Sequence, residues 1–282
     1  MKKIILLLLI AFNLSAQKVT PYYFDATGTN LYNVKAYGLL GDGSTNDRAA
    51  LNTLLNTTAP SGSTIFFPAG TYSIASGISI SDKYFHFVGS QATITICANN
   101  IQLLNISSTN ATNGLGSRWT VSDLVFTATT TGGGQVGLYF SGNAGLWTVE
   151  NCTFNGFSNA GIETLNSQTA STTNPSSLGG TIIGCKFYRN YSGVYNYTGG
   201  EYVQVIGCAM ISNTFGIQSI GGNENIQGNT ISYNVIGIDI GNGTNSGKCV
   251  IQGNEITHNS SVSINAHEIP STQGLSITNN NI

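Results

Sequence analysis

The fold is decided by four stretches that repeat one pattern: TIIGCKFYRNYSGVYN (181–196), QVIGCAMISNTFGIQS (204–219), NIQGNTISYNVIGIDI (225–240) and VIQGNEITHNSSVSIN (250–265). Each has an apolar residue three positions before a Cys or Asn, a Gly directly before it, and a second Asn five positions after it. From Cys185 to Asn280 these anchor residues are 23, 21, 25 and 26 residues apart. A period of this length is typical of stacked structural repeats.

The content of each repeat predicts strands. Short runs of β-branched and aromatic residues alternate with Gly or Asn, without helical periodicity. A chain that makes three short strands and three bends, and then starts again, winds a parallel β-solenoid. An Asn at a bend can hydrogen-bond the backbone and its copy in the next coil, so we expect Asn ladders at the repeated positions.

Composition limits the function classes. Only 8% of the 282 residues are charged, against about 25% in an ordinary globular domain. The net charge of −2 argues against a nucleic-acid partner.

The N-terminus predicts export. Residues 1–16 read as a signal peptide, with Lys2 and Lys3 before a short apolar run. Residues 17–32 read as an extended arm and 33–282 as the solenoid domain. No later apolar run is long enough to span a membrane. We therefore expect a secreted, extracellular or bacterial cell-surface protein.

The five cysteines do not form an obvious disulfide framework. Cys152, Cys185 and Cys208 occupy the anchor position that Asn229 and Asn254 occupy later. Stacked residues on parallel strands are about 4.8 Å apart, whereas a disulfide needs Cβ atoms about 3.8 Å apart. We expect buried free thiols, and the spacing does not suggest a zinc site.

A distinct block precedes the repeats: NVKAYGLLGDGSTNDRAALNTLL (33–55), followed by STIFFPAGTYSI (63–74). The spacing of Leu51, Leu54 and Leu55 predicts an amphipathic helix at about 45–56 that caps the first coil. Ser44 and Asp47 resemble a capping box with Asp in place of Glu. We assign Asp42 and Asp47 to the turn and the helix start.

This block resembles the opening of pectate-lyase-like proteins, which include a rhamnogalacturonase/epimerase-like group and phage tail spikes. The resemblance implies an all-β, right-handed, single-stranded parallel β-helix with an N-terminal capping α-helix, and acidic, pectin-like polysaccharide as the substrate class. It departs at Asn46-Asp47, where the family often has two acidic residues. Ca²⁺ is implied by the resemblance only, and no cofactor is evident from the residues themselves. The polygalacturonase motifs Asn-Thr-Asp, Asp-Asp and Gly-His-Gly are absent.

Alternation in the strand after each repeat's Gly predicts an outward row that suits a sugar chain, with rings for its apolar faces and polar groups for its hydroxyls. With Tyr197 added, the candidate substrate-binding residues are Tyr139, Glu163, Tyr195, Gln218, Asp239 and Tyr197. An ordinary solvated strand face explains the same alternation equally well.

Catalysis is harder to place. Glu163 and Asp239 are three coils apart, roughly 14 Å, which exceeds the carboxyl separation used in glycoside hydrolysis. The catalytic candidates are Glu163, Arg189 and Glu201, beside Tyr195 and Tyr197, where Tyr or Arg as base with a nearby Glu would support β-elimination. His267-Glu268 is a weaker candidate.

Two functions stay open at this point. One is a secreted protein that binds and degrades polysaccharide, as a lyase or a glycoside hydrolase. The other is a non-catalytic, adhesive surface solenoid that binds glycans. Because residues 279–282 stop inside a repeat, we expect the chain to continue or its open end to pack against a partner.

Overall fold

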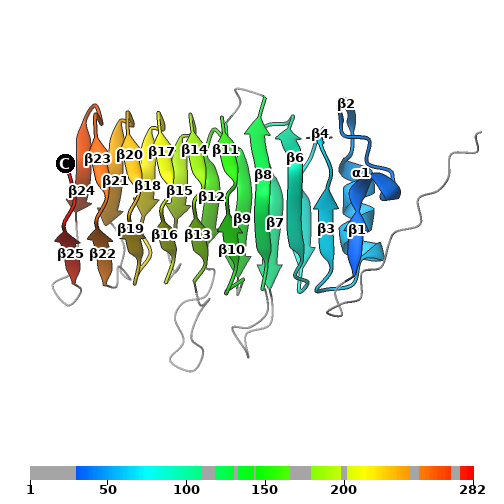
Figure 1. Ribbon diagram of the computed structural model, residues 1–282, viewed down its shortest axis with the longest axis horizontal. Coiled ribbons are helices and arrows are strands. Elements are labelled where there is room, and N and C mark those ends of the chain that lie inside the picture. Colours follow the sequence, from blue (N-terminus) through cyan, green and yellow to red (C-terminus); the bar gives the residue numbers. More distant parts are fainter. Residues whose placement is uncertain are drawn as a thin grey trace, which may run out of the picture.

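The computed structural model describes residues 30–108, 118–129, 133–142, 144–165, 179–197, 202–241, 248–267 and 274–282. The expected signal peptide, 1–16, and most of the arm, 17–32, lie outside these residues. The described strands form one sheet of 17 strands, here sheet A, and one of eight strands, here sheet B. Their coils stack along one axis from the N-terminal to the C-terminal end (Figure 1). The chain is an all-β parallel β-helix, as the repeats predict.

The N-terminal cap comprises β1 (Leu31–Asn33), a 3-10 turn (Val34–Tyr37), β2 (Asp42–Asn46), α1 (Arg48–Thr53) and a π-helical turn (Leu54–Thr58). The helix begins later than position 45 because residues up to Asn46 pair with β4 (Gly70–Ile74). Leu51, Leu54 and Leu55 are buried in the core, as their spacing predicts.

The expected capping box is wrong. Ser44 lies in β2, and Asp47 makes no side-chain capping hydrogen bond to the helix. The Asp47 carboxylate instead accepts hydrogen bonds from the backbone N–H groups of Leu40 (2.7 Å) and Gly41 (3.2 Å). Asp42 accepts from the N–H of Thr45 (2.7 Å). Both carboxylates therefore hold the turn before the helix, not the helix end itself.

The first coils contain β3 (Thr64–Phe67), β4, β5 (Ile78–Ser81), β6 (His86–Ile96), β7 (Gln102–Ser108), β8 (Thr120–Ala128) and β9 (Val136–Gly142). Of the described strands, β6 and β8 are the longest. From β10 onward each coil has three short strands, two in sheet A and one in sheet B. These are β10 (Thr148–Glu150), β11 (Thr153–Asn155), β12 (Ala160–Leu165), β13 (Thr181–Ile183), β14 (Lys186–Tyr188), β15 (Ser192–Asn196), β16 (Gln204–Ile206), β17 (Ala209–Ile211), β18 (Phe215–Ser219), β19 (Asn225–Gln227), β20 (Thr230–Ser232), β21 (Ile236–Gly241), β22 (Cys249–Gln252), β23 (Glu255–Thr257), β24 (Val262–His267) and β25 (Leu275–Thr278).

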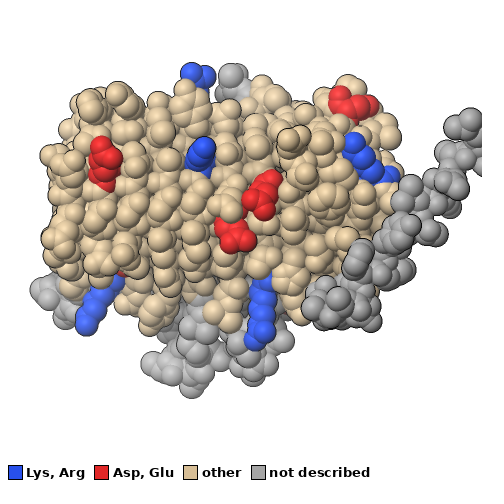
Figure 2. Space-filling model, in the orientation of Figure 1, with Lys and Arg blue, Asp and Glu red and all other residues tan. Residues whose placement is uncertain are grey.

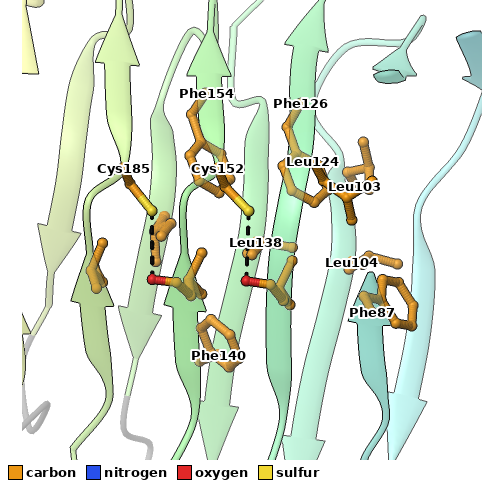
Figure 3. Close-up of a cluster of buried hydrophobic side chains, with 14 of the residues drawn as sticks. Phe87, Leu103, Leu104, Leu124, Phe126, Leu138, Phe140, Cys152, Phe154 and Cys185 are labelled. Atoms are coloured by element: carbon orange, nitrogen blue, oxygen red, sulfur yellow. Dashed lines mark hydrogen bonds between the residues drawn. The ribbon is translucent and has the colours of Figure 1, made fainter. Parts of the chain in front are cut away.

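Aromatic stacks fill the interior between the sheets. The rings of Phe126, Phe154 and Phe187 stack in consecutive coils, with centroids 4.9 and 5.0 Å apart. Figure 3 shows two of these rings beside the thiols of Cys152 and Cys185. Identical side chains at one position of successive coils therefore pack face to face, which fixes the register of the neighbouring strands.

The predicted Asn ladders are confirmed at both bends. Asn213 Nδ2 donates to Phe187 O (3.1 Å) and to Asn234 Oδ1 (3.0 Å), and the backbone N–H of Asn213 donates to the same oxygen (2.9 Å). At the other bend, Asn229 makes the equivalent bonds with Val205 O and Asn254. Each side chain joins three successive coils.

The cysteines are free, as predicted, and three of them replace the amide at the first bend. Cys185 Sγ lies 3.5 Å from Val149 O, and Cys208 Sγ lies 3.6 Å from Ile182 O. Asn229 Nδ2 donates to the corresponding carbonyl one coil later, Val205 O (2.9 Å). A thiol therefore takes the donor role of the Asn amide at the same position, with a longer contact.

Candidate functional site

The outward row predicted from the sequence is a continuous register on sheet B. Tyr139 pairs with Glu163, Glu163 with Tyr195, Tyr195 with Gln218, and Gln218 with Asp239. The row continues to Asn105 on β7 at one end and Asn265 on β24 at the other. We call these seven residues the sheet B row. The alternate positions, such as Ile162 and Val194, are buried.

Glycines beside the row fix its position. A Cβ atom built at Gly161 would lie 2.9 Å from Gly193 O and 2.8 Å from the ring of Phe187. Because contacts shorter than 3.0 Å would force the backbone apart, a side chain here would separate adjacent coils. The backbones of neighbouring coils therefore lie close together at Gly161, within β12 and two residues before Glu163.

Glu163 lies at the centre of an aromatic part of the row. Tyr139 and Tyr195 flank it in the two neighbouring coils. Its Oε2 accepts a hydrogen bond from Asn159 Nδ2 (2.7 Å). Burial raises the pKa of Glu163 to about 7 even though the Asn159 bond lowers it. At neutral pH this carboxyl is therefore divided between a proton donor and a carboxylate.

The two flanking tyrosines differ in exposure. Tyr139 is 8% exposed, so it forms a packed edge instead of the open ring that alternation suggested. Tyr195 is half-buried, and its ring contacts that of Tyr197 edge-on at 5.3 Å. Burial, followed by the neighbouring Tyr197 and Glu163, raises the pKa of Tyr195 to about 12. Its hydroxyl is thus a hydrogen-bond donor at neutral pH.

Internal contacts hold the distal part of the row. Gln218 Oε1 accepts from Ser192 Oγ (3.1 Å). Asp239 Oδ1 accepts from Asn265 Nδ2 (2.7 Å) and pairs with His267 Nε2 (3.2 Å). Of the weaker candidate pair, His267 thus faces Asp239, while Glu268 lies outside the described residues.

Of the two remaining catalytic candidates, the structure describes Arg189. Arg189 lies at the bend after β14, with its guanidinium 4.6 Å from the centroid of the Tyr188 ring. That contact directs its guanidinium to sheet A, whereas Glu163 lies on β12 in sheet B. Glu201 lies outside the described residues. Glu163 and Asp239 are three coils apart in the register, as expected, so they do not form a hydrolytic carboxyl pair.

Sequence reasoning missed a groove of about 380 Å³ on the outer face of sheet A. The residues that give it its chemistry are Thr153, Asn155, Lys186, Tyr188, Ala209 and Ile211. Figure 2 shows this side of the molecule, where few charged residues interrupt a neutral surface. The signal that could have found it is the Lys-Phe-Tyr sequence of β14, because a buried Phe187 leaves Lys186 and Tyr188 on the same outer face.

The described part of the chain holds no cluster of candidate metal ligands and no candidate membrane-spanning helix. No group of three or more His, Cys, Asp or Glu residues there is placed to hold a metal ion. None of its helices is long and apolar enough to cross a membrane.

Comparisons with known proteins find a matching family and a curated relative. Residues 31–114 match the family described as rhamnogalacturonase A/epimerase, pectate lyase-like. The non-secreted LysM effector LysM19 of Penicillium expansum is 30% identical over 138 residues, which cover 45% of this chain and 11% of that protein. The chain thus spans about a tenth of the curated relative that it matches.

Solved structures with similar chain traces include three of different kinds. ORF18 of Geobacillus virus E2 is 20% identical over 84% of this chain and 60% of its own, with a TM-score of 0.42. The A-module of the Azotobacter vinelandii mannuronan C-5 epimerase AlgE6 is 14% identical over 88% and 99%, with a TM-score of 0.41. The Streptococcus pneumoniae surface adhesin PfbA is 15% identical over 86% and 80%, with a TM-score of 0.34.

At these scores the solved structures assign no function to this chain, and the family match covers its opening segment. Residues 31–114, from β1 through the capping helix into the first coils, thus match the pectate-lyase-like rhamnogalacturonase A/epimerase family that the opening block predicts.

Proposed function

We propose that the protein is a polysaccharide-binding β-helix whose sheet B row holds an extended sugar chain along the coil axis. One observation carries the proposal: five consecutive coils place Tyr139, Glu163, Tyr195, Gln218 and Asp239 in one register. Coils are about 4.8 Å apart, close to the length of one sugar residue in an extended chain. Tyr139 is buried against its neighbours, so the other four coils each present one side chain to about one sugar residue.

The chemistry of the row suits hydroxyl-rich ligands. The half-buried Tyr195 ring offers an apolar surface against the C–H face of a sugar. Glu163 and Gln218 add acceptors, and Asn265 adds an amide at the distal end. The family match of residues 31–114 supports an acidic, pectin-like glycan as the class. The signal-like residues 1–16 support an extracellular or cell-surface location.

A lyase-type reaction is the second candidate, favoured by the raised pKa of Glu163. In β-elimination a base removes the proton beside the sugar carboxylate, the C–O bond to the leaving sugar breaks, and an acid protonates the leaving oxygen. Protonated Glu163 would supply the acid. Tyr195 is a poor base because its pKa is about 12, and Arg189 faces Tyr188. The described row offers an acid without a matched base, so binding is the better-supported function.

A glycan array read beside an activity screen tests the proposal. We expect the wild-type protein to retain acidic plant-type polysaccharides and Tyr195→Ala to lose about tenfold in affinity, as stacking contributions of this size imply. Tyr233→Ala is the matched control, because Tyr233 is exposed at a bend outside the row. Retention of every glycan by Tyr195→Ala at wild-type affinity would refute the proposed site.

The activity arm separates the two candidates. Release of unsaturated uronate by the wild type, abolished in Glu163→Gln while binding persists, would establish the lyase. Product release that is unchanged in Glu163→Gln would remove Glu163 from any reaction. Binding without product supports the non-catalytic function.

A further inference from the structure

The groove on sheet A lies on a different face from the sheet B row, so an inference from it does not depend on the proposed function. It spans β8, β11, β14 and β17 in four consecutive coils. Two outward rows line it. Val125, Thr153, Lys186 and Ala209 form one, and Asn155, Tyr188 and Ile211 form the other. Residues two apart on one strand lie about 7 Å apart, which is wide enough for one pyranose ring.

Side-chain size explains why the surface is hollow here. Ala209 follows Lys186 in its row, and Thr153 precedes it. Both side chains are short, so the floor between Lys186 and the neighbouring coils stays low. The next residue in the same row, Thr230, lies beyond the groove. The hollow is therefore built by specific residues and is not a general property of the sheet.

Lys186 gives the groove a positive charge. Lys186 is exposed and makes no ion pair with another described residue. Arg189 adds a second cation at the edge, held over the Tyr188 ring. In the Lys186 row the acidic residue is Glu255, three coils away, or roughly 14 Å. Glu150 lies on β10, before the bend at Asn151, whereas the groove strand β11 follows that bend.

We propose that this groove is a second saccharide site, selective for a sugar that carries a carboxylate. The carboxylate pairs with Lys186, while the Tyr188 ring and the Ile211 side chain contact the apolar face of the sugar. Asn155 and Thr153 meet its hydroxyls. A uronate residue supplies all three features within one ring, whereas a neutral sugar leaves Lys186 unpaired.

The test compares short oligogalacturonate with its fully methyl-esterified form, which has the same rings without the charge. By calorimetry, Lys186→Gln is expected to weaken binding of the acid about tenfold, the size of one charge-assisted contact, and to leave binding of the ester unchanged. Lys248→Gln, at an exposed lysine outside the groove, controls for general charge. Ala209→Phe should fill the floor and weaken binding of both ligands, while Thr230→Phe should weaken neither.

The outcomes separate this site from the sheet B row. If Lys186→Gln and Ala209→Phe both bind the acid as the wild type does, the groove is not a site. The same conclusion follows if the wild type does not bind the acid, or if Tyr195→Ala alone abolishes all binding. If Lys186→Gln and Ala209→Phe also weaken binding of the acid in a protein that already carries Tyr195→Ala, the groove is a binding site. This holds even if the sheet B row binds nothing.

Discussion

The Asn ladders and the sheet B row are both series of polar side chains at one position per coil, yet they differ in every other respect. The ladder repeats one residue, and each buried amide bonds to backbone and to its copy, as Asn213 does. The row changes residue type at each coil. Its contacts are mostly side chain to side chain, and a half-buried Glu163 has a raised pKa.

The difference indicates which positions serve the fold. A repeated residue at a repeated position satisfies the same backbone groups in each coil. A varied residue at a repeated position satisfies no backbone group that all the coils share, so the fold alone does not explain its chemistry.

Breaking the ladder should have the largest effect. Asn213→Ala leaves Phe187 O and the N–H of Asn190 without their partner. Unsatisfied buried groups cost about 1–3 kcal/mol each, so we expect a loss of about 3 kcal/mol in the free energy of unfolding, measured by denaturant titration. Gln227→Ala, at an exposed amide on β19, should change it by less than about 0.5 kcal/mol. Equal stability of the two variants would contradict the structural role of the ladder.

A buried carboxyl should make stability depend on pH. Burial raises the pKa of Glu224 from 4.5 to about 7, although Ser219 and Asn196 hydrogen-bond it. Because the folded pKa lies above the unfolded one, this contribution is complete below pH 4.5 and is lost as pH rises through about 7. The wild type should lose about 3 kcal/mol across that window, and Glu224→Gln should lose much less. Identical pH profiles of unfolding for the two proteins would rule out this titration.

Replacing a ring of the row should affect binding more than folding. Tyr195→Ala removes a half-buried ring that makes an edge contact with Tyr197. We expect about tenfold weaker glycan binding and a loss of less than about 1.5 kcal/mol in the free energy of unfolding. Parallel binding and thermal-melt measurements check both values. A large stability loss without any change in binding would place Tyr195 with the architectural residues.

Extending the ladder should have the smallest effect. Cys208 occupies the ladder position one coil before Asn229. Cys208→Asn would replace the thiol contact to Ile182 O (3.6 Å) by an amide donor. We expect a rise of up to about 1 kcal/mol in the free energy of unfolding. Cys97→Asn, at an exposed thiol, should change nothing measurable, and destabilisation by Cys208→Asn would show that the site is fitted to sulfur.

The sequence predicts the features that recur in every coil. It does not predict features that depend on the packing or hydrogen bonds of a single residue. Period-two alternation after each Gly places the sheet B row in its register, because the coils share one geometry. The capping box at Ser44 fails because Asp47 turns its carboxylate to Leu40 and Gly41, a choice set by the fold of the loop. The groove escapes prediction because its depth depends on the size of Ala209 across three coils. The burial of Tyr139 depends likewise on packing between coils.

The most direct test of the contrast is one glycan array with two variants. A row variant carrying Glu163→Gln, Tyr195→Ala and Gln218→Ala is compared with Asn213→Ala at a temperature where both remain folded. We predict that the row variant loses glycans that Asn213→Ala still retains, with the sheet A groove blocked by Ala209→Phe in both. Wild-type retention by the row variant, or equal loss by both, would contradict the account.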